Sequence, residues 1–215
     1  MKDNGQKPIA GQEESQRPKK GISRRGFLKG AGITTAGTVM LQTGILGNAQ
    51  AEVLEEGPVG PDAILLKMKV NGHTRTVQVE PRSTLADALR NHLGLTGTKV
   101  VCDRGSCSAC TVWLDGKPVN SCMTLAMDVG DREITTIEGI ARDGALHPVQ
   151  QAFIDHDATQ CGYCTSGMIM STVHLLNENP KPNLEDVKKA VRGNLCRCGT
   201  HPNVFKATLD AAKKL

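Results

Sequence analysis

The sequence predicts an α+β fold in which an N-terminal β-grasp module is followed by a four-helix bundle. Three observations support this prediction: β-like segments with tight-turn dipeptides fill the middle of the chain, helical periodicity begins at His147, and the eight cysteines divide into two groups of four. The composition, 39% hydrophobic but only 2% aromatic, indicates globular domains with aliphatic cores.

Five strands and one helix are expected in residues 62–138. The strands are expected at Ile64–Val70, Thr74–Glu80, Thr111–Leu114, Lys117–Val119 and Glu133–Ile137. Asn71-Gly72 and Asp115-Gly116 are dipeptides typical of tight hairpin turns. Thr84 can cap the helix, whose apolar face ends at Gly94. Strands that surround one helix are typical of a β-grasp module.

Residues 145–215 follow a helical period instead. Four apolar faces are expected, formed by Val149/Ala152/Phe153, Met168/Thr172/Leu175/Leu176, Leu184/Val187/Val191 and Val204/Thr208/Leu209/Ala212. Asn183 is a plausible N-cap of the third helix. Helices this short cannot bury a core alone, so we expect them to pack as a bundle. The module boundary is placed near residues 137–147, where Gly and Pro interrupt both patterns.

Residues 1–51 resemble a twin-arginine signal peptide. Ser23–Lys29 carries the paired arginines, and a weakly apolar, Thr-rich stretch, Gly30–Gly47, follows it. Ala49–Ala51 has the small-x-small pattern of a cleavage site. We therefore expect cleavage after Ala51, a linker over residues 52–61, and a periplasmic protein that is exported already folded.

The charge distribution argues against a nucleic-acid partner. The formal net charge is +4, but residues 1–51 hold 8 of the 26 Lys/Arg and 3 of the 22 Asp/Glu, which leaves 18 against 19. Phosphate binding needs a concentrated basic face, and none is expected after cleavage. The mature part also has no apolar run long enough to span a membrane.

The first cysteine group is Cys102, Cys107, Cys110 and Cys122. Its C-x4-C-x2-C spacing with a distant fourth cysteine matches the plant-type 2Fe-2S pattern. The intervening residues are mostly Gly, Ser and Ala, which suits a loop that must turn sharply and direct N–H groups at anionic sulfurs. A structural zinc site and disulfides remain open alternatives, because eight cysteines allow about 105 pairings.

The second cysteine group is Cys161, Cys164, Cys196 and Cys198, spaced C-x2-C-x31-C-x-C. A C-x2-C pair alone could be a thiol redox pair, and C-x-C alone could bind zinc. Each pair here precedes an expected helix, where free N–H groups and the helix dipole favour thiolates. We expect all eight cysteines to be metal ligands, with these four forming one pocket into which N–H groups at the two helix starts point.

Three motifs together resemble a known family. Cys102–Cys110 (CDRGSCSAC), Gln160–Gly167 (QCGYCTSG) and Gly193–Cys198 (GNLCRC) are similar to motifs of the iron-sulfur subunit of the xanthine oxidase family of molybdenum hydroxylases. The resemblance covers residues 63–215, and the signal peptide suggests the periplasmic aldehyde oxidoreductase branch. It implies a plant-type ferredoxin-like β-grasp domain followed by a helical 2Fe-2S domain.

The same resemblance implies partners and cofactors. Electrons would pass from a molybdenum-pterin cofactor in a large subunit, through both clusters, to FAD in a medium subunit. No catalytic residue is then expected in this chain. Positions matching Gln160 and Cys198 contact the pterin in relatives, which implies cofactor binding here.

Two positions depart from the family pattern. Ser108 stands where relatives usually have Gly, and a left-handed backbone there would cost about 1–2 kcal/mol. Gly199-Thr200 stands where many relatives have Thr-Gly, so the turn into the last helix could differ. Neither departure removes a ligand.

The expected reaction of the complex is the oxidation of aldehydes to carboxylates. The alternatives are an iron-sulfur subunit of an N-heterocycle or xanthine-type dehydrogenase, a stand-alone exported ferredoxin, and a periplasmic binding protein stabilised by zinc or disulfides. A stand-alone ferredoxin would need only the first cysteine group, so the helical module argues against it. The substrate is selected by the partner's pocket.

Overall fold

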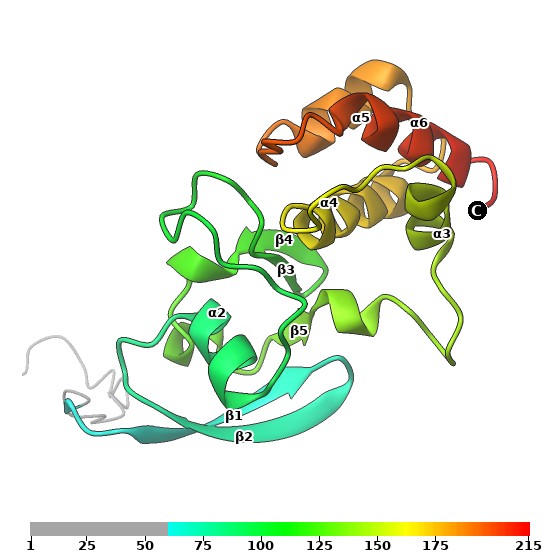
Figure 1. The fold of residues 1–215 in the computed structure, drawn as a ribbon. Coiled ribbons are helices and arrows are strands. Elements are labelled where there is room, and N and C mark those ends of the chain that lie inside the picture. The colour runs from blue at the N-terminus through cyan, green and yellow to red at the C-terminus, as the bar shows by residue number, and fades with distance from the viewer. Residues whose placement is uncertain (1–59) are drawn as a thin grey trace, which may run out of the picture. The chain divides into compact units, whose positions relative to one another are not determined.

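The fold is described by a computed structural model, which covers residues 60–215. The expected signal peptide and most of the expected linker lie outside the described residues, so both stay predictions. The elements are β1 (Ile64–Val70), β2 (His73–Val79), α2 (Leu85–Asp87), a π-helical turn (Ala88–His92), β3 (Thr111–Leu114), β4 (Lys117–Asn120), β5 (Glu133–Thr135), α3 (Pro148–Asp155), α4 (Thr165–Glu178), α5 (Leu184–Val191) and α6 (His201–Ala211), with short 3-10 turns at Ser121–Met123, Met127–Val129 and Ile137–Gly139 (Figure 1).

The five strands form one mixed sheet in the order β2-β1-β5-β3-β4. β1 pairs with β5 in parallel, and the other neighbours are antiparallel. Both expected turn dipeptides have positive φ at each residue, 51° and 78° at Asn71-Gly72 and 48° and 75° at Asp115-Gly116. This backbone matches the right-handed twist of the flanking strands. All five expected strands are therefore present.

β5 ends at Thr135, two residues before its expected end. The next N–H, that of Thr136, donates to the side chain of Asn71 (2.9 Å), and the Asn71 amide donates to the Thr136 hydroxyl (3.0 Å). Because the N–H and the hydroxyl of Thr136 are bonded to the side chain of Asn71 in the hairpin turn, the chain leaves the sheet at this point.

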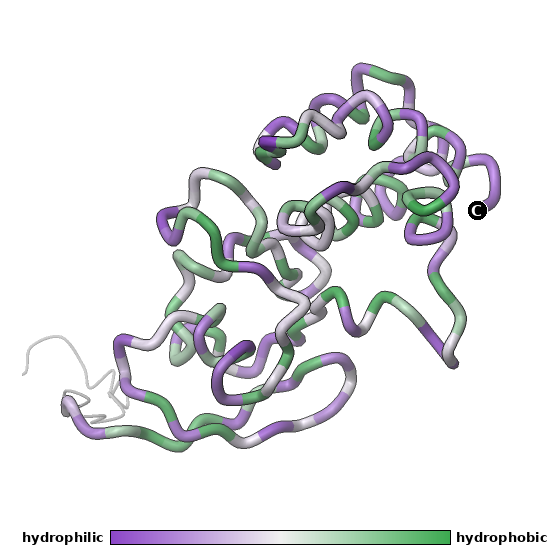
Figure 2. The backbone as a smooth tube through the Cα atoms, viewed as in Figure 1, coloured by the Kyte–Doolittle hydropathy of each residue, from purple (hydrophilic) through white to green (hydrophobic). Residues whose placement is uncertain are grey.

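The sheet packs on the helical segment after Thr84, whose hydroxyl caps it by accepting the Asp87 N–H as expected (3.2 Å). Instead of one regular helix, a single α turn widens into the π-helical turn Ala88–His92. The core between sheet and helix consists of alternate strand residues and the apolar helical residues. Its buried members are Met68, Val70, Val77, Val79, Leu85, Ala88, Leu89, Val112, Leu114, Ala126, Val129 and Ile134. Apolar residues alternate with lysines over Leu66–Val70 of β1, and the colour of the tube changes accordingly in Figure 2.

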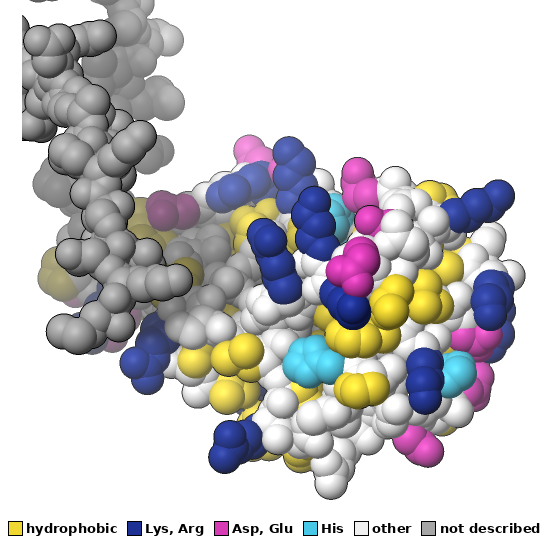
Figure 3. Space-filling model, turned by 90° about the horizontal axis from the view of Figure 1, so that it is seen from above, with side chains coloured by type: hydrophobic (Ala, Val, Ile, Leu, Met, Phe, Trp, Pro, Cys, Tyr) yellow, Lys and Arg dark blue, Asp and Glu magenta, His cyan; other side chains and the backbone are white. Residues whose placement is uncertain are grey.

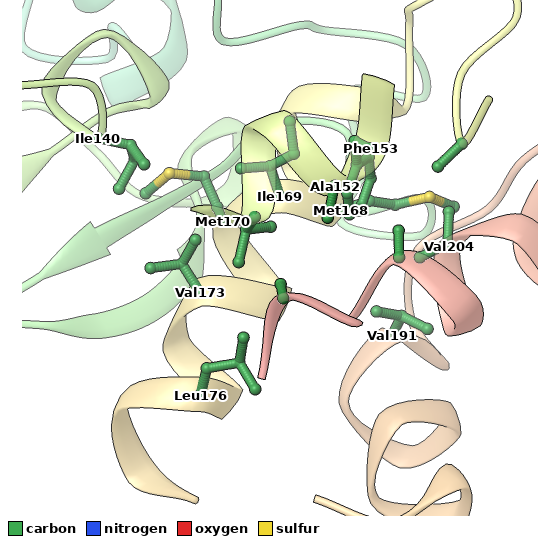
Figure 4. Close-up of a cluster of buried hydrophobic side chains, with 14 of the residues drawn as sticks. Ile140, Ala152, Phe153, Met168, Ile169, Met170, Val173, Leu176, Val191 and Val204 are labelled. Carbon is green, nitrogen blue, oxygen red and sulfur yellow. The ribbon is translucent and has the colours of Figure 1, made fainter. Parts of the chain in front are cut away.

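The C-terminal part contains helices α3–α6 at the four expected places. Asn183 caps α5, as expected, by accepting the N–H groups of Glu185 and Asp186. α3 packs against α6, and α5 packs against both α4 and α6. In Figure 4, Met168 of α4 reaches toward Val204. These helices share one apolar core.

Trp113 of β3 joins the sheet to this helical core. The side chain is 8% exposed and belongs to the cluster of α3–α6 rather than to the core under the sheet. Its indole N–H donates to the carbonyl of Met170 in α4 (3.2 Å). A buried indole usually needs such a partner, so this contact positions β3 beside α4.

Gly167 allows α4 to approach the first cysteine loop closely. A Cβ atom at this position would lie 2.2 Å from the backbone oxygen of Ser108 and 3.1 Å from Cα of Ala109. Backbone atoms cannot move aside as a flexible side chain can. Glycine is therefore required where the helix and the loop meet.

Figure 3 shows basic, acidic and hydrophobic side chains interspersed on the face that it draws. Among residues 60–215, none of the helices has both the length and the apolar character needed to cross a membrane.

We predict that Gly167→Ala lowers stability. In an unobstructed helix this change adds about 0.5–1 kcal/mol of stability, but overpacking against backbone costs about 1–3 kcal/mol. The clash should dominate, so the free energy of unfolding measured in urea should fall. A rise in the free energy of unfolding would contradict the close contact with Ser108.

Candidate metal centres

The first cysteine loop is folded so that backbone N–H groups point at sulfur. The N–H of Gly105 donates to Sγ of Cys122 and the N–H of Ser106 donates to Sγ of Cys102, both at 3.3 Å. Gly105 has φ of 71°, and a Cβ there would meet Cγ of Met123 at 3.0 Å. The glycine thus lets the loop turn and direct its amide inward.

Hydrogen bonding and burial act in opposite directions on two thiols of this loop. Hydrogen bonds, the largest with the Arg104 N–H, lower the pKa of Cys102 to about 7. Burial raises the pKa of Cys122 to about 11. The loop therefore favours the thiolate of Cys102 more than that of Cys122.

The second group lies where α4 and α6 begin. Cys164 is the residue before α4, and burial raises its pKa to about 12. Burial alone would also raise the pKa of Cys196, but hydrogen bonds from the hydroxyl and N–H of Thr200, the N-cap of α6, lower it to about 6. The Thr200 hydroxyl lies 3.1 Å from Sγ of Cys196. The expected placement of both cysteine pairs at helix starts is confirmed.

The four thiols of the second group differ in exposure. Cys161 and Cys198 are exposed, whereas Cys164 is buried and Cys196 is partly covered. Two thiols of this group are therefore accessible from outside.

The donor sets fit 2Fe-2S clusters. Each iron of such a cluster takes two protein ligands, so one cluster uses four cysteine thiolates. Each domain supplies four cysteines, and in the first loop two backbone N–H groups donate to cysteine sulfurs. The eight cysteines and these hydrogen bonds therefore fit two 2Fe-2S clusters.

The two departures from the family pattern have local explanations. Ser108 does adopt the left-handed backbone, with φ of 53°. Its carbonyl oxygen accepts the hydroxyl of Thr111 at 2.7 Å, which helps to hold this conformation. Gly199 takes φ of 79°, which leaves Thr200 free to contact Cys196. Both turns are thus compatible with the residues present.

Gln160 and Cys198, the two positions implied to contact a pterin, are both exposed. Gln160 adjoins the exposed Cys161 in sequence. Tyr163 and Leu195, which neighbour cysteines of the second group in sequence, are also exposed, at 61% and 59%. Each of these side chains is therefore accessible to a partner.

Asn194 is a site residue that sequence reasoning missed. It is buried, 2% exposed, and its amide donates to the carbonyl of Ser108 at 3.1 Å. The neighbouring Leu195 N–H donates to the carbonyl of Cys107 at 3.1 Å. Both residues lie in the motif Gly193–Cys198, but a motif of ligands gives no signal for a contact with the other cysteine loop.

Comparisons with known proteins identify the two modules separately. Residues 68–136 match a family described as the 2Fe-2S iron-sulfur cluster binding domain. Residues 136–209, which contain the helices, match a second family, described as the [2Fe-2S] binding domain. A chain with two such domains, each carrying four cysteines, belongs to the class of two-cluster iron-sulfur electron carriers.

Relatives define the family more closely. The chain is 41% identical over 209 residues to the aldehyde oxidoreductase iron-sulfur-binding subunit of Escherichia coli O157:H7, covering 90% of each chain. It is 49% identical over 154 residues to the nicotine 6-hydroxylase small subunit of Paenarthrobacter nicotinovorans, covering 72% of this chain and 93% of the relative. The solved quinoline 2-oxidoreductase of Pseudomonas putida 86 contains a chain that matches with a TM-score of 0.69 and 41% identity, over 71% of this chain and 95% of that chain. This chain belongs to the family of iron-sulfur subunits of xanthine oxidase-type molybdenum hydroxylases.

Because the cysteines form two separate groups of four, we predict that each cluster can be removed separately. Cys164→Ala deletes a buried thiol of the second group, so this variant should lose about half of the iron and one EPR signal. Cys110→Ala is the matched change in the first group and should abolish the other signal instead. Iron analysis and low-temperature EPR would check both. Loss of both signals from either variant would contradict independent sites.

Proposed function

We propose that this chain is the electron-transfer subunit of an exported, aldehyde-oxidising molybdenum hydroxylase. The proposed ligands are Cys102, Cys107, Cys110 and Cys122 for one 2Fe-2S cluster and Cys161, Cys164, Cys196 and Cys198 for the other. Bound there, the clusters would relay electrons from a molybdenum-pterin cofactor in a large partner subunit to FAD in a medium partner subunit. The observation that carries the proposal is that two 2Fe-2S domains each hold four cysteines, with backbone N–H groups donating to sulfur in the first loop.

The modular organisation is part of the proposal. The β-grasp domain would extend over residues 62–138 and the helical domain over residues 145–215, with helices α3–α6 arranged as a four-helix bundle. The helix contacts and the separate family matches support this division.

The docking surface for the large subunit is proposed at the exposed side of the second cysteine group. Gln160 and Cys198 would contact the pterin, because a side-chain amide can both donate and accept hydrogen bonds. Tyr163 and Leu195 would be covered by the partner, since both are large, exposed side chains next to cysteines of this group in sequence. No substrate chemistry is assigned to residues of this chain.

Aldehydes are proposed as substrates because of how far the alignment reaches. Residues 60–215 make up less than three quarters of the chain, so a match covering 90% of it must include residues before position 60. The nicotine 6-hydroxylase subunit matches 72% of the chain. The alignment with the aldehyde oxidoreductase subunit thus extends into the N-terminal region, which favours aldehydes. Export by the twin-arginine pathway is proposed from the Ser23–Lys29 motif.

An N-heterocycle hydroxylase is the second candidate. It is favoured by the higher identity to the nicotine 6-hydroxylase subunit, 49%, and by the match to quinoline 2-oxidoreductase. The two candidates differ in the substrate of the partner, so activity of the co-purified complex on aldehydes and on nicotinate-like heterocycles would separate them.

The function is tested by metal analysis of the protein purified with its bound partners. We expect about four irons and four labile sulfides per chain, two distinct EPR signals after dithionite reduction, and molybdenum in a co-eluting chain. A colourless, iron-free product would contradict the proposal.

Export is tested by replacing Arg24 and Arg25 with Lys together. The proposed signal depends on the arginine pair, so the assembled complex should remain in the cytoplasm. Arg17→Lys, which lies outside the motif, is the matched control and should leave export unchanged. Fractionation followed by an activity assay provides the measurement. Normal periplasmic activity of the double variant would refute the assignment.

A further inference from the structure

We propose that Asn194 is a positioning residue that fixes the separation of the two cluster sites. The inference rests on the proposed pair of 2Fe-2S clusters and concerns how the chain holds them relative to each other. It starts from a buried side-chain amide that touches none of the eight cysteines directly, yet connects the loops that carry them.

Every backbone and side-chain polar group of Asn194 has a partner. Its N–H donates to the carbonyl of Val191 (2.9 Å), and its carbonyl oxygen lies 2.9 Å from Nε2 of His201. The side-chain oxygen accepts the hydroxyl of Ser171 (3.0 Å), and the side-chain nitrogen donates to the carbonyl of Ser108 (3.1 Å). A buried amide whose oxygen and nitrogen each have a partner has one defined orientation.

These partners lie in separate parts of the fold. Ser171 belongs to α4, His201 begins α6, and Ser108 lies in the first cysteine loop, 86 residues away in sequence. Ser171 and His201 hold the amide from the helical side. The Ser108 contact is therefore the one that crosses to the other cysteine group.

The backbone of the first loop is shaped for this contact. The left-handed conformation of Ser108 turns its carbonyl outward, where it accepts from both Thr111 and Asn194. The adjacent carbonyl of Cys107 accepts the N–H of Leu195. Two consecutive carbonyls of one loop are thus bound by two consecutive residues of the other, directly before Cys196.

The same region is closed by small residues. A Cβ at Gly167 would clash with the Ser108 carbonyl, and a Cβ at Gly193 would lie 3.2 Å from the Ser108 hydroxyl. The loop is therefore confined between α4 and the Gly193–Asn194 segment. Without the Asn194 amide, the Ser108 carbonyl keeps Thr111 as a partner but loses its link to the second loop.

The test uses the full chain, loaded and reduced so that both clusters are paramagnetic, with the variants Asn194→Ala and Asn194→Asp. Asp keeps the shape of Asn and can accept from Ser171, but an ionised carboxylate cannot donate to Ser108. The magnetic dipolar splitting between two reduced centres weakens as they move apart. We expect both variants to keep two EPR signals and wild-type iron content while the splitting decreases.

Asn179→Ala is the matched control. Asn179 is half-buried in the same helical domain and makes two side-chain hydrogen bonds, with Asp186 and Lys181, but contacts neither cysteine loop. The dipolar splitting between the clusters of this variant should equal that of the wild type, even if its thermal stability falls. If the splitting depended only on the general stability of the domain, it would decrease in the control variant as well.

The outcomes separate this inference from the proposed function. Unchanged splitting in both Asn194 variants would overturn the positioning role while leaving the two-cluster proposal intact. Loss of iron from one site would also overturn it, because Asn194 would then be needed to hold a cluster. A wild-type protein without iron would instead contradict the proposed function itself.

Discussion

The contact between the first cysteine loop and the helical domain is the constraint on which the rest of the structure depends. The loop must direct its N–H groups toward its own sulfurs, as Gly105 and Ser106 do, so its carbonyls point outward. Buried carbonyls need donors from elsewhere. Asn194 and Leu195 supply them, and the second cysteine group follows immediately in the chain. Meeting the hydrogen-bonding needs of one site thus places the other beside it.

Glycine and left-handed residues make this arrangement possible. Gly167 removes a side chain where α4 meets the backbone of Ser108, and the positive φ of Ser108 turns its carbonyl toward the helical domain. Trp113 adds an apolar anchor with one hydrogen bond, to Met170. Close backbone approach, rather than a large polar interface, therefore holds the two domains together. Such contacts tolerate little change in volume.

The electrostatics of the second group suit a site at a domain surface. Two helices begin there, and Thr200 directs both its hydroxyl and its N–H at Cys196, which lowers the pKa of that thiol. Cys164 lies buried at the start of α4, while Cys161 and Cys198 are exposed. The inner thiols are thus fixed by the fold, and the outer two are accessible, as are Gln160, Tyr163 and Leu195.

The sequence by itself determined the features that depend on neighbouring residues. The turns at Asn71-Gly72 and Asp115-Gly116, the cap at Asn183 and the two cysteine groups were all predictable, because hydrogen bonds and spacing within a few residues define them. Only the tertiary structure decided which core receives Trp113 and that Asn194 binds Ser108. Those contacts join residues far apart in the chain, where local pattern carries no information about which surfaces meet.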